Sequence, residues 1–130
     1  MNLLLDTHVV LWWVDGSKRL GSRAKAAMFR SNTTVWISAA SAWELAIKFG
    51  AGRLRMSEPP EKTISTLLDR GFHGLPISMR HALAVRSLPT HHTDPFDRML
   101  VAQATCEDLT IVTVDPSISE YDVRTMDASV

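Results

Sequence analysis

Apolar positions along the chain alternate between short continuous runs and longer runs with helical spacing. The short runs predict buried strands at residues 3–5, 34–38, 75–77 and 109–114, with a last edge strand at 121–125. The longer runs predict helices over residues 7–15, 22–29, 41–49, 60–70, 78–85 and 95–108. This alternation is typical of βαβ units. It predicts a three-layer α/β/α domain with a mostly parallel central sheet and right-handed crossovers.

Residues with known preferences for helix ends support these boundaries. Thr7, Ser41 and Ser78 are placed to cap the starts of helices. Gly16 and Gly71 are placed to end them. We find no internal repeat, no low-complexity segment and no linker, so residues 1–130 are expected to form a single domain.

Composition narrows the class of protein. Lys and Arg together number 14, as do Asp and Glu, so net charge predicts no bulk attraction to nucleic acid or to a membrane. A neutral total still permits an acidic pocket with a basic rim. The only cysteine, Cys106, excludes an internal disulfide and suits a reducing compartment. Without a signal peptide or a membrane-length apolar stretch, the expected location is the cytoplasm.

Four carboxylates lie just past the predicted strands. Asp6 and Asp115 directly end two of the apolar runs, Glu44 follows the run 34–38 by six positions, and Asp97 opens a helix. The carboxyl ends of parallel strands share one edge of the sheet, where ligands bind. Four acids at that edge cannot all stay ionised without a counterion. A hard divalent cation is the natural one, so the chain is a candidate metal-dependent enzyme.

Each acid also has a purely structural interpretation. The segments 41–44 and 94–97 both have the frame of a capping box, in which Glu44 or Asp97 would reach back to a helix start. Asp115 precedes a proline and could be a helix cap, and Asp6 could bond the helix that follows it. Since a helix N-terminus helps keep a carboxylate ionised, capping and metal binding are compatible.

Three motifs carry a resemblance to a known family. They are Leu4-Leu5-Asp6-Thr7, the segment from Ser38 to Glu44, and His92-Thr93-Asp94-Pro95-Phe96-Asp97-Arg98 followed by Thr113-Val114-Asp115. In order and spacing they resemble the PIN-domain ribonucleases, and among these the VapC toxins of bacterial toxin–antitoxin pairs. The resemblance spans nearly the whole chain.

The resemblance implies a PIN fold and a metal-dependent endoribonuclease that acts as a toxin. By that match Asp6, Glu44, Asp97 and Asp115 bind Mg²⁺ or Mn²⁺, with Asp115 the acid most suited to acting through water. Thr113 matches a hydroxyl near the metal-bound water, and Ser41 is expected to form a hydrogen bond within the pocket. Asp94 is expected to remain a helix cap.

RNA binding requires positive charge near the acidic cleft. Lys48, Arg53 and Arg98 are the leading candidates, although Arg98 could instead pair with an acid of the site. Further basic candidates are Arg19, Arg23 and Arg55. His91 and His92 lie in a predicted loop and are expected to be solvated, with contact to an RNA phosphate as the alternative. No cysteine or histidine pattern favours zinc.

The tryptophans bear on the partners. Trp36 and Trp43 are expected in the core, whereas the adjacent Trp12 and Trp13 cannot face the same direction on a helix, so one should reach a surface. That surface could be a dimer contact or a groove for a partner helix. The resemblance implies a homodimer and a VapB-like antitoxin segment lying across the early helices, with no membrane partner.

Two other classes of function stay open from the residues alone. One is a PIN-like module that binds RNA or protein without cleaving it, which loss of an acid would favour; all four are present. The other is a metal-dependent nuclease acting on DNA, because a carboxylate–metal site does not by itself distinguish the sugar. RNA sequence preference depends on loop shape and cannot be read from the sequence.

Overall fold

Five parallel strands form the centre of the molecule. The computed structural model describes all 130 residues. The strands are β1 (Asn2–Leu5), β2 (Thr34–Ser38), β3 (His73–Leu75), β4 (Thr110–Thr113) and β5 (Thr125–Asp127), in the order β3-β2-β1-β4-β5. Every neighbouring pair is parallel. The predicted α/β class with a parallel sheet is confirmed.

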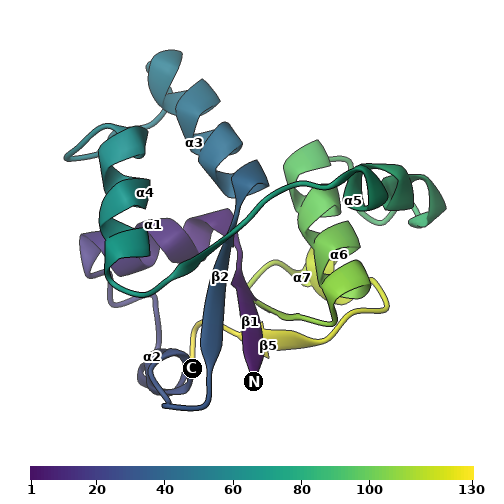
Figure 1. Cartoon of the computed structure of the whole chain (residues 1–130), viewed down its shortest axis with the longest axis horizontal. Helices are drawn as coiled ribbons and strands as arrows, with labels where there is room; N and C mark the ends of the chain where they lie inside the picture. Colours follow the sequence, from purple (N-terminus) through teal and green to yellow (C-terminus); the bar gives the residue numbers. More distant parts are fainter.

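Helices cover both faces of this sheet. They are α1 (Thr7–Asp15), α2 (Ser22–Met28), α3 (Ala39–Gly50), α4 (Pro60–Asp69), α5 (Met79–Ala84), α6 (Pro95–Glu107) and the short α7 (Pro116–Ser119), with a 3₁₀ turn at Val85–Ser87. In Figure 1, α1, α2 and α4 lie on one side of the strands and α5, α6 and α7 on the other, while α3 stands beyond the strand tips. No helix combines the length and apolar character that crossing a membrane would require.

The strand β1 is the central strand, and it sets the edge at which the site forms. Leu4 is paired with Trp36 of β2 on one side and Ile111 of β4 on the other. The chain adds β2 and β3 on one side of β1, then returns to add β4 and β5 on the opposite side. The edge of the sheet beyond the tips of β1 and β4 is therefore the switch point, where open α/β sheets bind ligands.

Alternation along the strands divides the core in two. Leu3 and Leu5 of β1 face a cluster with residues of α1, α2 and α4, whereas Leu4 faces a cluster with residues of α6 and α7. Successive side chains of a strand point to opposite faces, so one short apolar run supplies both layers. This explains why the strands are continuously apolar in the sequence.

Two predicted strands are displaced along the chain. The strand predicted at 75–77 lies instead at His73–Leu75, because Pro76 has no N–H to donate to a ladder. The strand predicted at 121–125 lies at Thr125–Asp127. There the chain first turns, with the Val123 amide donating to the Tyr121 carbonyl at 2.8 Å, and Tyr121 packs into the core.

Two predicted caps are also displaced, in one case to the last residue of the preceding strand and in the other to the residue just after it. Ser38, not Ser41, caps α3, because its extended backbone lets the hydroxyl accept a hydrogen bond from the Ala40 amide at 2.9 Å. The capping box predicted at 41–44 is therefore wrong. Asp6, not Thr7, caps α1 through the His8 amide. Ser78 caps α5 and the left-handed Gly16 ends α1, as predicted.

The tryptophans depart from expectation. Trp43 is 58% exposed rather than in the core, and its ring meets Phe96 edge-on with 5.1 Å between centroids. Trp36 is half-buried against the core cluster that contains Leu4. Trp12 and Trp13 are both half-buried against the other cluster. Because adjacent side chains on a helix point in different directions, the two rings cannot both face the core fully, and each stays partly exposed.

A buried polar network connects α3 to α5 and α6. Gln103 is fully buried; its Oε1 accepts from the Ser38 hydroxyl at 2.5 Å, and its Nε2 donates to the Pro76 carbonyl at 3.3 Å. The ring of His81 lies against Gln103 and bonds Glu107 at 2.8 Å. Since Ser38 also caps α3, Gln103 fixes the start of the helix that carries Glu44.

The first prediction concerns Gln103. Gln103→Leu should lower the free energy of unfolding by about 2 kcal/mol, because the buried Ser38 hydroxyl and Pro76 carbonyl lose their partner. Urea denaturation measures this. Thr105→Val, on the exposed face of the same helix, should stay within about 0.5 kcal/mol of the unsubstituted chain. Equal effects of the two substitutions would contradict the assigned role.

Candidate functional site

The four predicted acids come from four elements that meet at the carboxyl edge of the sheet. Asp6 follows β1, Asp115 follows β4, Glu44 lies in the second turn of α3, and Asp97 lies in the first turn of α6. The negative charges of Asp6 and Glu44 both act to raise the pKa of Asp97, so these three acids share one electrostatic environment. Successive acids are 18 to 53 residues apart along the chain, so the fold brings them together.

Asp6 is a buried carboxylate with a donor on each oxygen. The Thr113 hydroxyl donates to its Oδ2 at 2.6 Å, and the His8 amide donates to its Oδ1 at 3.3 Å. Burial acts to raise the pKa of Asp6, but hydrogen bonds from His8 and Thr113 outweigh it and hold the pKa below its usual value. Asp6 therefore stays ionised.

Glu44 is also buried, but only one of its oxygens is bound. Its side chain is 5% exposed, and Oε2 lies 2.5 Å from the ammonium of Lys48 one turn along α3. Its Oε1 is buried without any hydrogen-bond partner. Burying a carboxylate oxygen without a hydrogen-bond donor destabilises the fold. A cation bound at this oxygen would remove that destabilisation.

Asp97 carries the strongest sign of crowded charge. Burial, reinforced by the negative charges of Asp6, Asp94 and Glu44, raises the pKa of Asp97 to about 7. The N-terminus of α6 favours the ionised form, but this effect is too small to compensate. Asp94 itself caps α6 by accepting from the Phe96 and Asp97 amides, as predicted.

A histidine bridges Asp97 and Asp115. The Nε2 atom of His92 lies 2.9 Å from Asp97 Oδ2 and 3.2 Å from Asp115 Oδ2. Ligand atoms of these three residues lie within 4.8 Å of one another, a spacing that could hold a metal ion. The other oxygen of Asp115 accepts from the Ser117 amide at 2.8 Å. Asp115 is thus both a cap of α7 and a member of the acidic group.

The two supporting hydroxyls join the elements of the site. Thr113 donates to Asp6 and accepts from the Asp115 amide at 3.0 Å, so one hydroxyl orders acids from two strands. Ser41 is fully buried and accepts from the Thr7 hydroxyl at 2.8 Å, which links α1 to α3. Their roles beside a metal-bound water and within the pocket stay predictions.

Two histidines that were not predicted as site residues lie beside the acids. His92 was expected to be solvated, but it contacts two acids. His8 lies at the rim with its Nδ1 3.8 Å from Asp6 Oδ1, and this contact, followed by the charges of Glu44 and Asp97, raises the pKa of His8 against the effect of burial. The only sequence signal for these contacts is proximity along the chain, because His8 lies two residues after Asp6 and His92 two residues before Asp94.

The basic residues take different positions. Lys48 pairs with Glu44 and so lies beside the acids. Arg98 does not pair with an acid of the site; its guanidinium donates to the Pro89 and Val85 carbonyls and the Tyr121 hydroxyl. Arg53 is exposed in the loop after α3.

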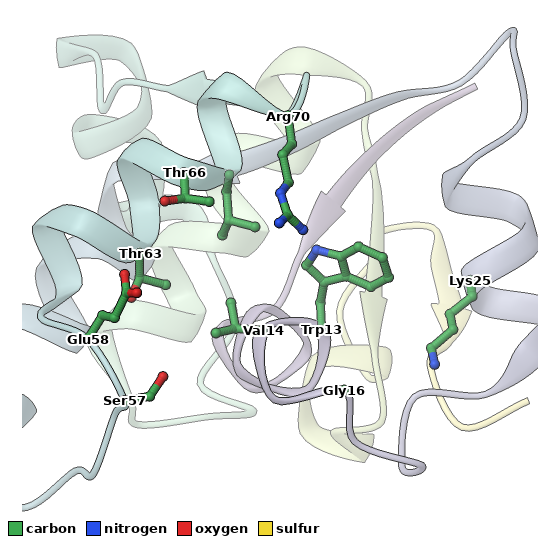
Figure 2. Close-up of a pocket in the computed structure, with 10 residues that line it drawn as sticks. Trp13, Val14, Gly16, Lys25, Ser57, Glu58, Thr63, Thr66 and Arg70 are labelled. Carbon is green, nitrogen blue, oxygen red and sulfur yellow. The ribbon is translucent and has the colours of Figure 1, made fainter.

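A separate cavity of about 430 Å³ lies between α1 and α4, away from the acids. Figure 2 shows Trp13 and Val14 of α1 on one side and Thr63 and Thr66 of α4 on the other, with Arg70 just past the end of α4 and Lys25 of α2 at the far edge. The guanidinium of Arg70 extends toward the Trp13 ring. The cavity thus combines an exposed aromatic surface with charged groups at its border.

Comparison with known proteins identifies the class to which this fold and site belong. The family model described as PIN domain matches residues 3–124. The chain therefore belongs to the PIN-domain family, as the sequence motifs predicted. A search among curated proteins found no significant match.

Several solved structures share the fold along the full chain. VapBC2 from Rickettsia felis, bound to a DNA fragment from its promoter, superposes with a TM-score of 0.74 at 16% identity, covering 97% of this chain and 98% of that one. FitAcB from Neisseria gonorrhoeae gives 0.66 at 23% identity and 97% of each chain. DNA-bound VapBC from Salmonella typhimurium gives 0.65 at 18% identity and 98% of each. At these identities the likeness concerns the fold.

The second prediction follows from the raised pKa of Asp97. A carboxyl that binds its proton more tightly when folded stabilises the fold at low pH, and this contribution is lost as pH rises from about 4 through 7. Asp97→Asn removes the ionised form, so the metal-free variant should be more stable than the unsubstituted chain at pH 8. A shift from 3.8 to about 7 corresponds to roughly 4 kcal/mol at most.

Thermal unfolding in the presence of a chelator measures this difference. The advantage of Asp97→Asn should fall by more than half between pH 8 and pH 5. Glu61→Gln is the matched control, because Glu61 also lies in the first turn of a helix but is exposed. An Asp97→Asn variant that is less stable at pH 8 would mean that the carboxylate serves the fold.

Proposed function

We propose that this protein is a metal-dependent endoribonuclease, a toxin of a toxin–antitoxin pair, that uses Mg²⁺ or Mn²⁺ held by Asp6, Glu44, Asp97 and Asp115. The observation that carries the proposal is the crowding of these acids at the switch point of the sheet, expressed in the raised pKa of Asp97. Membership of the PIN-domain family supports it, since the resemblance implies this reaction.

The residues fit a hard divalent cation. Glu44 Oε1 is buried without a donor, and Asp97 is ionised at neutral pH only at a cost. All the acids offer oxygen ligands, which Mg²⁺ and Mn²⁺ prefer. When bound, such an ion acidifies a water molecule and neutralises charge that develops on the scissile phosphate.

The chain's own side chains prepare the site for that chemistry. Thr113 keeps Asp6 ionised and oriented, and its hydroxyl lies between the starts of two helices that both follow central strands. Lys48 neutralises one oxygen of Glu44 and leaves the other free. The result is a set of preoriented carboxylates, which need not reorganise when RNA arrives.

Contacts with RNA are proposed for Lys48, Arg53 and Arg98. Lys48 is the strongest of the three because its ammonium already lies beside Glu44. Arg53 is exposed and free to reach a phosphate along the backbone of the RNA. Arg98 would first have to break its hydrogen bonds to the Pro89 and Val85 carbonyls, so its contribution to RNA binding should be smaller.

The third prediction concerns activity. Purified protein should cleave a mixed RNA pool with Mg²⁺ or Mn²⁺ and lose this activity with EDTA. Asp97→Asn and Glu44→Gln should each lower the rate by at least about 100-fold, the scale of losing a group that stabilises developing charge. Asp69→Asn, an exposed acid at the end of α4, is the control and should leave the rate unchanged.

A DNA pool of the same composition is the second arm of this experiment. Cleavage of DNA alone would replace the ribonuclease with a deoxyribonuclease. Absence of both cleavage and metal binding by calorimetry would leave a non-catalytic binding module. Cleavage that persists in EDTA would contradict any role for the acids in holding a metal.

A proposed antitoxin partner fits the cavity between α1 and α4. A partner segment could insert an apolar side chain against Trp13 and place charges beside Arg70 and Glu58. A proposed homodimer would cover other apolar side chains, such as Met79 and Leu83, which are 79% and 71% exposed on α5. Such exposed apolar groups are typical of surfaces that meet a partner.

The fourth prediction tests the antitoxin surface. The product of a small reading frame adjacent to the gene, when co-expressed, should co-purify with this chain and suppress its cleavage of RNA. Thr66→Arg, which fills the cavity from an exposed position, should weaken that complex by at least about tenfold and leave cleavage intact. Thr105→Arg on α6 is the control. Equal binding by both variants would place the antitoxin elsewhere.

A further inference from the structure

His92 contacts the carboxylate groups of two of the site's acids through a single atom. Its Nε2 lies 2.9 Å from Asp97 and 3.2 Å from Asp115. The two acids belong to different elements, since Asp97 is in α6 and Asp115 caps α7. A shared contact of this kind fixes the position of one carboxylate relative to the other.

The backbone determines which ring nitrogen of His92 carries the proton. The Asp94 amide donates to His92 Nδ1 at 3.2 Å. A backbone N–H can only donate, so Nδ1 must accept and the ring proton must reside on Nε2. His92 is therefore a hydrogen-bond donor toward Asp97 and Asp115. In this tautomer Nε2 has no lone pair with which to bind a metal.

His92 is itself held in place from outside the site. Its amide donates to the Tyr121 hydroxyl at 3.0 Å, and Tyr121 is 4% exposed. The same hydroxyl accepts from Arg98, whose guanidinium also holds the Pro89 and Val85 carbonyls. These hydrogen bonds hold the loop before α6 against Tyr121 and against the 3₁₀ turn that contains Val85, which explains why Arg98 faces its own loop.

We propose that His92 is a positioning residue: it donates its Nε2–H to Asp97 and Asp115 and holds the two carboxylates ready to share a cation. The proposal rests on the proposed function, because it concerns the same metal site. The role is to orient ligands and not to bind the ion. Hydrogen bonds to ligating carboxylates typically change metal affinity by about 10–100-fold when they are removed.

Two substitutions separate the functions of the two ring nitrogens. Asn offers an acceptor where Nδ1 meets the Asp94 amide but is too short to reach the acids. Gln extends far enough to place an amide N–H near the position of Nε2. Affinity for Mn²⁺ is measured on the full chain by the loss of the free-ion electron paramagnetic resonance signal. His91→Gln is the control in the same loop, because the contacts of His91 are with Glu120 and Tyr121, which lie outside the group of four site acids.

The expected result is a loss of about tenfold in Mn²⁺ affinity for His92→Asn and a loss of no more than about threefold for His92→Gln. Tyr121→Phe removes the hydroxyl that holds His92 and should weaken Mn²⁺ binding by a smaller factor than His92→Asn. It provides a test even if His92→Asn fails to fold, which circular dichroism would reveal.

Three results would overturn the proposal. Unchanged affinity in His92→Asn would show that the contact does not order the acids. Tighter binding would show that the imidazole competes with the ion. Equal losses of Mn²⁺ affinity in His92→Asn and His92→Gln, each larger than the loss of Mg²⁺ affinity, would make His92 a direct ligand. Failure of the unsubstituted chain to bind Mn²⁺ would instead refute the proposed function itself.

Discussion

The pairing of β1 with neighbours on both sides is the constraint on which the rest of the site depends. It fixes the tip of β1 beside the tip of β4, and the Asp6 amide continues the ladder by donating to the Val112 carbonyl at 3.1 Å. Asp6 cannot move away from the acids that follow the neighbouring elements without breaking this pairing. Repulsion between the acids is therefore opposed by the hydrophobic core. Leu3 and Leu5 of β1 are buried in the core on one face of the sheet, and Leu4 is buried on the other.

Helix capping and acid placement turn out to be one arrangement. Asp6, Asp94 and Asp115 each accept from backbone amides of the helix that follows, and two of them also belong to the acidic group. The structural interpretation of Asp6 and Asp115 as caps is confirmed, and it does not keep either residue out of the acidic group. Glu44 differs, because its helix is capped six residues earlier by Ser38.

The fold and the positions of Asp6 and Asp115 at the sheet edge could be predicted because they depend on local signals. Continuous apolar runs reveal buried strands, and an acid directly after such a run must lie at the strand tip. The displaced caps at Ser38 and Asp6 could not be predicted so well, because strand ends and helix starts overlap by a residue or two. His92 and Trp43 were misjudged for a different reason. Their surroundings are set by contacts with Asp115 and Phe96, which lie far along the chain.

The internal hydrogen bonds of the acids also limit how they can coordinate an ion. Both oxygens of Asp6 and both of Asp115 already receive a donor, from His8 and Thr113 in one case and from Ser117 and His92 in the other. Bidentate coordination by either residue would compete with these donors, so each is suited to offering a single oxygen. Calcium commonly relies on bidentate carboxylates and six to eight ligands, whereas magnesium accepts few protein ligands and keeps its water. In the proposed site, the hydrogen bonds of Asp6 and Asp115 would therefore favour magnesium over calcium before any substrate is bound.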